Sequence, residues 1–237
     1  MSASLTIKLY MDGAEIDTMK RLHAEGSVQG FTTNPTLMRK AGVSDYEKFA
    51  REAIAAIPDL PLSFEVFSDD IPDMEREARK IASWGGNTFI KVPITNTRRE
   101  STVPMIKKLA QEGFRLNVTA ILTLDQVRAV AGALHADTPA IVSVFAGRIA
   151  DTGRDPMPIM RESAALLKGL PKAELLWAST REFLNLYQAQ DAGCHIITVP
   201  PDILSKRKLA GSDLDDFSLD TVKMFFKDAT QAGFRIL

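Results

Sequence analysis

Cysteine and histidine are scarce in this sequence, and the scarcity narrows the chemistry that it can perform. The 237 residues include one cysteine, Cys194, and three histidines. A single cysteine excludes an internal disulfide framework and favours a reducing compartment, so we expect a cytoplasmic protein. The histidines, His23, His135 and His195, are scattered and lack the spacing of metal ligands. We therefore predict no metal site, and no nucleotide-binding motif indicates an organic cofactor.

Long apolar runs and an excess of charge of either sign are also absent. The N-terminus "MSASLTIKLYMDG" lacks the apolar core of a signal peptide. No stretch approaches the roughly 20 apolar residues of a membrane-spanning helix. The 29 basic and 30 acidic residues nearly cancel, and the basic clusters "TRR" and "SKRK" are short. The composition therefore favours neither a nucleic acid nor a membrane as a partner.

The sequence does contain a regular alternation of two patterns. Amphipathic segments with helical spacing cover residues 44–57, 74–82, 103–110, 123–134, 159–167, 181–190 and 218–230, the last with Ser218 as its expected cap. Between them lie runs rich in β-branched residues, typical of parallel strands buried on both faces. These runs are "TIKLYMD", "VQGFTT", "PLSFEVF", "TFIKVPI", "FRLNVTAI", "AIVSVFAG", "ELLWAS" and "CHIITVP".

Eight strand-like runs that alternate with helical segments predict an α/β protein. No shift in composition and no Gly- or Pro-rich linker divides the chain. We therefore predict one (β/α)8 TIM barrel, a single catalytic domain over residues 1–237. The alternative is an open doubly wound sheet, which needs a Gly-rich phosphate turn after its first strand. The segment "YMDGAEID" at that place has no G-x-G-x-x-G pattern.

In such a barrel the active site lies at the C-terminal ends of the strands. Polar residues fall late in seven of the eight runs, so the fold would bring them to one mouth. They are Asp12, Thr33, Asn34, Glu65, Lys91, Asn117, Thr119, Ser143, Arg148, Ser179 and Arg181.

Lys91 lies within the apolar stretch "NTFIKVPI". Lysine is rarely buried unless it is paired or functional. An apolar environment favours the neutral amine, which can attack a carbonyl group and form a Schiff base. Taken alone, the residue is better explained as a salt-bridged or snorkelling lysine at a strand end. Asp12 could likewise be a helix cap, Asn34 a turn element before a proline, and Arg148 a partner of Asp151 or Asp155.

Cleavage of a C–C bond beside an iminium group also needs acid/base groups. A carboxylate must take the proton of the hydroxyl beyond the bond, and a second group must serve the water and imine steps. Asp12 and Glu65 are the candidates, and Thr119 could hold a water between Glu65 and the lysine.

Other residues of the set suit a sugar with an anionic end. Asn34 and Asn117 offer donors and acceptors to sugar hydroxyls. Arg148, Ser179 and Arg181 form a candidate clamp for an oxyanion, because guanidinium groups match phosphate oxygens. Such a pocket would also accept a sulfonate.

Four motifs, "GFTTNPTLM", "FIKVP", "LNVTAILT" and "SVFAGRIAD", resemble the transaldolase family, which includes a short fructose-6-phosphate aldolase-like branch. The resemblance extends from "LYMD" to "ITVPPDIL". It implies a (β/α)8 barrel and a metal-free Schiff-base mechanism without a cofactor. By position, Lys91 matches the Schiff-base lysine and Asp12 the acid/base for the C4 hydroxyl of the donor. Asn34 and Asn117 match substrate-binding residues, and Thr119 matches the residue that holds the catalytic water.

The remaining residues match substrate contacts of the family. Ser143 matches a contact to the dihydroxyacetone unit, and Arg148, Ser179 and Arg181 match the phosphate site. Thr33, beside the asparagine of "TTNP", is included among the expected substrate contacts. The resemblance implies sugar-phosphate substrates, a place in the pentose phosphate pathway and a homo-oligomer. The apolar last helix could cover its own barrel, which we expect, or pack on a neighbouring subunit.

Two positions separate the branches of the family. Transaldolases are similar to this chain in having Glu and Phe at the positions of Glu65 and Phe145, whereas the aldolases have Gln and Tyr. We therefore predict a transferase that moves a dihydroxyacetone unit from sedoheptulose 7-phosphate or fructose 6-phosphate to an aldose phosphate. One alternative is a fructose-6-phosphate aldolase-like lyase. A further one is a barrel that binds a sugar phosphate without turnover.

Overall fold

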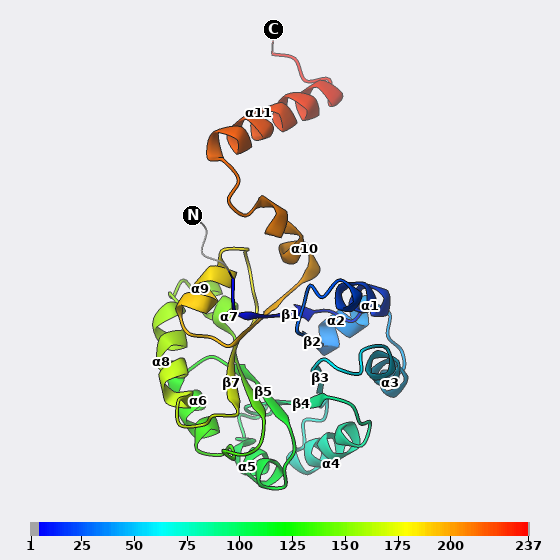
Figure 1. Ribbon diagram of the computed structural model, residues 1–237, viewed down its shortest axis with the longest axis vertical. Coiled ribbons are helices and arrows are strands. Elements are labelled where there is room, and N and C mark those ends of the chain that lie inside the picture. The colour runs from blue at the N-terminus through cyan, green and yellow to red at the C-terminus, as the bar shows by residue number, and fades with distance from the viewer. Residues whose placement is uncertain (1–4, 237) are drawn as a thin grey trace.

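The computed structural model describes residues 5–236, in which eight parallel strands close into a barrel (Figure 1). Each strand pairs with its neighbours in sequence, and β1 also pairs with β8. The strands are β1 (Lys8–Asp12), β2 (Gly30–Thr32), β3 (Leu62–Glu65), β4 (Thr88–Pro93), β5 (Leu116–Ile121), β6 (Ala140–Val144), β7 (Ala173–Trp177) and β8 (Ile196–Val199). The predicted (β/α)8 barrel is confirmed, and the open sheet is wrong. Residues 1–4 and 237 of the predicted domain lie outside the described residues.

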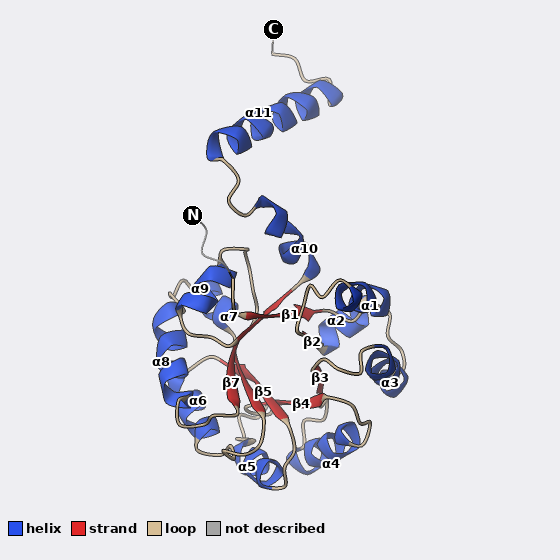
Figure 2. Cartoon of the chain, viewed as in Figure 1, coloured by secondary structure: helices blue, strands red, loops and turns tan. Residues whose placement is uncertain are grey.

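Helices surround the ring of strands (Figure 2). Every predicted helical segment overlaps a helix whose ends differ from the prediction by at most four residues. Helix α11 begins earlier than predicted, because Asp213 rather than Ser218 caps it. The helices are α1 (Ile16–Ala24), α2 (Pro35–Lys40), α3 (Tyr46–Ala56), α4 (Ile71–Ala82), α5 (Val103–Gln111), α6 (Leu124–Ala131), α7 (Ala146–Asp151), α8 (Met157–Leu167), α9 (Asn185–Asp191), α10 (Pro201–Leu204), the 3-10 helix η1 (Ser205–Leu209) and α11 (Leu214–Gln231).

Two hydrophobic cores hold the barrel together. The larger one fills the space between the strands and the surrounding helices. The smaller one lies inside the barrel and consists of Tyr10, Phe89, Ile141, Leu176, Ala178 and Ile196. Because side chains two residues apart on a strand share a face, each inward-facing apolar residue is followed by an inward-facing residue nearer the mouth. The interior core therefore forms the floor of the polar site.

Helix α11 stands away from the barrel, beyond α10 and η1 (Figure 1). None of its residues is buried, and the side chains of Leu214 and Phe226 are 80% and 74% exposed. The expectation that this helix covers its own barrel is wrong. The chain leaves the barrel through η1 and a turn at Gly211, whose φ of 77° suits glycine. Within residues 5–236, no helix combines the length and the apolar character needed to cross a membrane.

Gly30 permits the packing of the interior core. A Cβ at this position would lie 2.5 Å from Cζ of the Tyr10 ring. We predict that Gly30→Ala lowers the free energy of unfolding by about 1–3 kcal/mol, because the ring must shift in a filled barrel. Urea denaturation measures the effect. Gly169→Ala is the control, since its Cβ would meet no atom within 4 Å, and equal midpoints for the two variants would contradict the prediction.

Candidate active site

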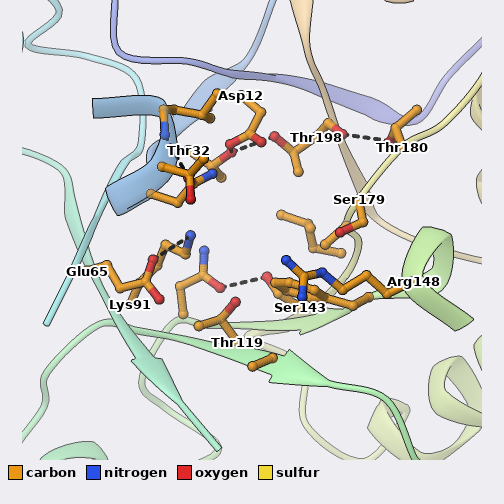
Figure 3. Close-up of a pocket in the computed structure, with 18 of the residues that line it drawn as sticks. Asp12, Thr32, Glu65, Lys91, Thr119, Ser143, Arg148, Ser179, Thr180 and Thr198 are labelled. Carbon is orange, nitrogen blue, oxygen red and sulfur yellow. Dashed lines mark hydrogen bonds and ion pairs between the residues drawn. The ribbon is translucent and has the colours of Figure 1, made fainter. Parts of the chain in front are cut away.

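A cavity of about 520 Å³ opens at the C-terminal ends of the strands. It brings together eleven of the twelve predicted site residues (Figure 3). Every strand contributes to its wall, either directly or through the segment that follows the strand. The predicted residues that line it are Asp12, Asn34, Glu65, Lys91, Asn117, Thr119, Ser143, Phe145, Arg148, Ser179 and Arg181.

Lys91 lies on β4 and is only 6% exposed. Its Nζ donates a hydrogen bond to the carbonyl oxygen of Thr33 at 2.7 Å and lies 3.2 Å from Oε2 of Glu65. Burial of an ammonium group costs several kcal/mol unless a partner compensates for the lost water. The salt-bridge alternative is therefore correct about the pairing, but the pair lies inside the cavity rather than at a solvated strand end.

Asp12 lies opposite Lys91 in the cavity (Figure 3). Burial raises the pKa of its carboxyl group above the usual range, although Lys91 and a hydrogen bond from Thr32 oppose the shift. Thr32 donates to Oδ1 of Asp12 at 2.8 Å, and its Oγ1 lies 2.5 Å from Oγ1 of Thr198. Asp12 lies on β1 and does not cap a helix, because the N-cap of α1 is Glu15. A buried carboxyl group with a raised pKa is suited to accept and return a proton.

A chain of hydrogen bonds across three strands orders polar side chains of the cavity. Ser143 donates to Oδ1 of Asn117 at 2.7 Å, and Nδ2 of Asn117 donates to Oγ of Ser63 at 3.1 Å. These bonds fix the orientation of the Asn117 amide. Asn34 lines the same cavity, while its Oδ1 caps α2 by accepting from the backbone N–H of Leu37 at 3.0 Å. The turn hypothesis for Asn34 is thus correct, and it is compatible with a place in the site.

Strand β5 has an irregularity next to Thr119. The register against β6 shifts between Val118 and Ile121, and Ala120 has a φ of 60°, which is uncommon for a residue with a Cβ. Thr119 faces the cavity because it lies two residues after Asn117, whereas the bulge adds Ala120 to the cavity wall and turns Ile121 into the outer core. Oγ1 of Thr119 is buried and has no hydrogen-bond partner among the described residues. The hydroxyl can therefore bond to a ligand or a water in the cavity.

The candidate anion site lies where α7 contacts the segment that follows β7. Ser179, just after β7, has a φ of 61°, which costs a residue with a Cβ of the order of 1 kcal/mol or more. A Cβ on Gly147 would lie 1.6 Å from the Ser179 carbonyl oxygen, and the N–H of Gly147 donates to the Ala178 carbonyl at 3.3 Å. The glycine thus lets α7 contact the strained backbone directly. This contact brings Arg148 of α7 and Ser179 to the same side of the cavity.

The two arginines of this site differ in their contacts. The guanidinium of Arg148 lies over the ring of Phe145, 5.4 Å from the ring centroid. Arg181 forms a bidentate ion pair with Asp151. Its Nε lies 3.1 Å from Oδ1 of the carboxylate, and its Nη2 lies 2.5 Å from Oδ2. This pairing, together with the nearby charge of Arg148, lowers the pKa of Asp151. The sequence-based alternative that Arg148 pairs with Asp151 or Asp155 is wrong. Arg181 pairs with Asp151, and Asp155 accepts from the backbone N–H of Met157 at 2.9 Å.

Thr33 is the one predicted site residue that does not line the cavity. Its hydroxyl donates to the carbonyl oxygen of Ser63 at 3.0 Å. Strand alternation explains the error, since Thr32 and Asn34 face the cavity and the residue between them faces away. The analysis of the sequence also missed Thr180 and Thr198, which line the cavity, because single threonines in apolar runs are no distinct signal.

The cavity therefore combines one buried amine, two carboxyl groups and two guanidinium groups. An amine next to a carboxylate can perform carbonyl chemistry, and the guanidinium groups can bind an anion. Within residues 5–236, no three His, Cys, Asp or Glu side chains are grouped so that they could hold a metal ion.

Asp12→Asn is expected to stabilise the protein near neutral pH. Burial raises the folded-state pKa of Asp12 above its unfolded value, so the folded state binds more protons between the two values. The free energy of unfolding therefore falls as pH rises from the unfolded to the folded pKa, and asparagine removes this loss. Thermal unfolding should show a higher Tm for the variant at pH 7.5, with a difference that shrinks towards about pH 4.

The exposed Asp137 provides the control for this experiment. Asp137→Asn should change the free energy of unfolding by less than about 0.5 kcal/mol at either pH. A lower Tm for Asp12→Asn than for the native protein at pH 7.5 would contradict the assignment of Asp12 as a desolvated carboxyl group.

Comparison with known proteins identifies the sequence family. Residues 9–236 match the family described as Transaldolase/Fructose-6-phosphate aldolase. A "Probable transaldolase" of Dehalococcoides mccartyi is 35% identical over 199 residues, which cover 84% of this chain and 88% of the relative. A "Probable transaldolase" of a Thermoanaerobacter species is 34% identical over 233 residues, which cover 97% of this chain and 100% of the relative.

A solved structure supports the fold independently. The crystal structure of 3-hexulose-6-phosphate synthase from Salmonella typhimurium is similar with a TM-score of 0.58 and 15% sequence identity, covering 82% of this chain and 89% of the other. At that identity the likeness concerns the fold alone. The family rests on the sequence match, which spans nearly the whole chain and includes all the residues that line the cavity. This protein is a member of the transaldolase/fructose-6-phosphate aldolase family.

Proposed function

We propose that the protein is a transaldolase-type transferase. It moves a dihydroxyacetone unit from a ketose phosphate, either sedoheptulose 7-phosphate or fructose 6-phosphate, to an aldose phosphate. The observation that carries the proposal is the buried pair of Lys91 and Glu65, 3.2 Å apart, in a cavity that also contains Asp12. This set supplies a nucleophile and two acid/base groups for reaction at a carbonyl.

The first step forms the Schiff base. The amine of Lys91, once it has given a proton to Glu65, attacks the C2 carbonyl of the ketose to form a carbinolamine. Loss of the C2 hydroxyl as water, with a proton from Glu65, yields the iminium ion. We assign this water to Thr119. Its buried hydroxyl has no hydrogen-bond partner among the described residues, and the residue lines the cavity.

The second step breaks the C3–C4 bond. Asp12 takes the proton of the C4 hydroxyl, the bonding electrons move to the iminium nitrogen, and an aldose leaves as its aldehyde. The enamine that remains on Lys91 attacks the aldehyde of the acceptor, and Asp12 returns the proton to the new hydroxyl. Hydrolysis of the new iminium ion releases the product ketose and the free lysine. The raised pKa of Asp12 suits a group that carries this proton in both directions.

The polar groups around the lysine suit the rest of the substrate. Asn34, Asn117 and Ser143 offer hydrogen bonds to the hydroxyls of the dihydroxyacetone unit. Arg148 and Arg181, together with Ser179, offer charge and hydrogen bonds to a terminal phosphate. A sulfonate has the same charge-bearing oxygens at its end, so the clamp would also accept one.

Phe145 favours the transferase over the lyase. Its ring lines the cavity beneath the Arg148 guanidinium and has no hydroxyl that could orient a water for hydrolysis. Because the enamine on Lys91 is then protonated and hydrolysed only slowly, it persists until an acceptor aldehyde binds. The alternative, a fructose-6-phosphate aldolase-like lyase, requires efficient release of dihydroxyacetone without an acceptor.

We further propose the setting of this activity. Residues 1–237 form one catalytic domain that acts in the cytoplasm, in the pentose phosphate pathway, without a cofactor. The single cysteine supports the reducing compartment, and the family supports the pathway.

We also propose that the protein is a homo-oligomer. Helix α11 takes the place in the chain where a (β/α)8 fold has its eighth covering helix, yet it projects from its own barrel (Figure 1). Monomers rarely expose so much contiguous apolar surface. A second copy offers the type of surface that this helix would otherwise cover. The exposed apolar side chains of α11 are Leu214, Phe217, Leu219, Val222, Met224, Phe225 and Phe226.

Borohydride trapping tests the proposed activity. Incubation with fructose 6-phosphate and reduction should leave an adduct of dihydroxyacetone size on Lys91, detected by peptide mass spectrometry. Addition of erythrose 4-phosphate should clear the adduct, because the acceptor consumes the enamine. Lys91→Met should lose the adduct, and transfer activity should fall on the order of 10³-fold or more. Lys107→Met, at an exposed position, is the matched control and should retain both.

Three outcomes separate the alternatives. Ketose cleavage that is as fast without an acceptor as with one would support the lyase. Tight binding of ketose phosphates without any adduct or turnover would support the sugar-binding barrel. Unchanged activity of Lys91→Met on ketose phosphates would contradict both enzymatic hypotheses.

Sedimentation tests the proposed assembly. The native protein should sediment as a multiple of its 26.0 kDa chain mass. Phe225→Glu should reduce the sedimenting mass. Phe225 is 62% exposed in the isolated chain, and the proposed assembly would bury the charge that the variant introduces. Lys227→Glu on the same helix is the control for charge. Native protein that sediments at 26.0 kDa throughout the micromolar range would refute the proposal.

A further inference from the structure

Pairing between β2 and β3 ends before the catalytic end of β3. The register of β2 against β3 contains only Phe31 with Leu62 and Thr32 with Ser63. The register of β3 against β4 continues as far as Glu65 with Lys91. The main chain of Glu65 therefore has a strand on one side and none on the other.

Lys91 bonds to the main chain at the point where the pairing ends. The N–H of Thr33 donates to the carbonyl of Ser63 at 3.3 Å, as in a parallel ladder. The next bond of such a ladder would run from the N–H of Glu65 to the carbonyl of Thr33. That carbonyl accepts instead from Nζ of Lys91 at 2.7 Å. The Thr33 carbonyl thus accepts from the lysine and not from β3, and the N–H of Glu65 needs another partner.

The hydroxyl of Tyr46 is that partner. It accepts from the N–H of Glu65 at 2.7 Å and donates to the carbonyl of Glu65 at 3.0 Å. One oxygen atom therefore satisfies both main-chain groups that the missing strand would have paired. Burial raises the pKa of Tyr46, so the hydroxyl keeps the proton that it donates.

Tyr46 is held firmly in this position. It is the first residue of α3, and Asp45 caps that helix by accepting from the N–H of Lys48 at 3.0 Å. Its ring packs against three other aromatic rings. The distances between ring centroids are 6.2 Å to Phe64, 4.5 Å to Phe67 and 5.3 Å to Trp84.

We infer that Tyr46 is a positioning residue for Glu65. Its hydroxyl holds the Glu65 main chain so that the carboxylate lies beside Lys91, and it leaves the Thr33 carbonyl to the lysine. The inference rests on the proposed acid/base function of Glu65. Tyr46 does not line the catalytic cavity, so any effect on catalysis must pass through another residue.

Tyr46→Phe tests this role, because it removes one oxygen atom and keeps the aromatic cluster. The rate of Schiff-base formation, measured by rapid mixing and borohydride quench, should fall roughly 10- to 100-fold while KM changes little. Phe67→Leu is the matched control, since it disturbs the same cluster without removing a hydrogen bond. It should lower the Tm and leave the rate within about 2-fold of the native value.

A double-mutant cycle separates positioning from a general structural role. On a Glu65→Gln background, Tyr46→Phe should change the rate by less than about 2-fold, because the group that Tyr46 positions is no longer an acid or base. An equal loss on both backgrounds would overturn the inference.

Hydrogen exchange provides a measurement that does not depend on activity. In the native protein the Glu65 amide should exchange as slowly as the other amides of β3, and Tyr46→Phe should speed the exchange of the peptide that contains it. Exchange of the native Glu65 amide at the rate of a free amide would contradict the inference, even if the variant did not fold. Failure to trap any ketose on the native protein would contradict only the proposed function.

Discussion

The buried ammonium group of Lys91 is the constraint on which the rest of the site depends. A charge in the middle of a barrel is costly unless a counter-charge and hydrogen bonds replace the water. Glu65 provides the charge, and the Thr33 carbonyl provides a hydrogen bond at 2.7 Å. Lys91 bonds to the Thr33 carbonyl at the point where β2 and β3 stop pairing, and the Tyr46 hydroxyl accepts from the N–H of Glu65 there. The environment of the lysine and the end of the strand pairing thus share the same main-chain groups.

Each strand serves two purposes along its length. The N-terminal half of β1 sends Tyr10 into the interior core, and two residues later the same face presents Asp12 to the cavity. Burial at this end of the strand raises the pKa of Asp12. Packing of the interior core depends on the absence of a side chain at Gly30, beside the Tyr10 ring.

Backbone strain is concentrated at the mouth of the barrel. Ala120 and Ser179 both have positive φ values, and both line the cavity. At Ala120 the strain accompanies a bulge that adds this residue to the cavity wall, and at Ser179 it accompanies direct contact with α7 through Gly147. Such conformations persist only where the surrounding structure holds them. Here the closed sheet holds them, so that residues with a strained backbone keep fixed positions in the site.

The sequence by itself determined the eight strands, seven of the helices and half of the residues that line the cavity, because periodicity and strand ends are local features of the chain. Only the tertiary structure decided which groups pair. Thr32 rather than Thr33 faces the cavity, Arg181 rather than Arg148 holds Asp151, and Tyr46 reaches Glu65 from another element. These contacts depend on how elements distant in the chain pack together. The same holds for α11, whose apolar face was readable from the sequence, whereas its position away from the barrel (Figure 1) was not.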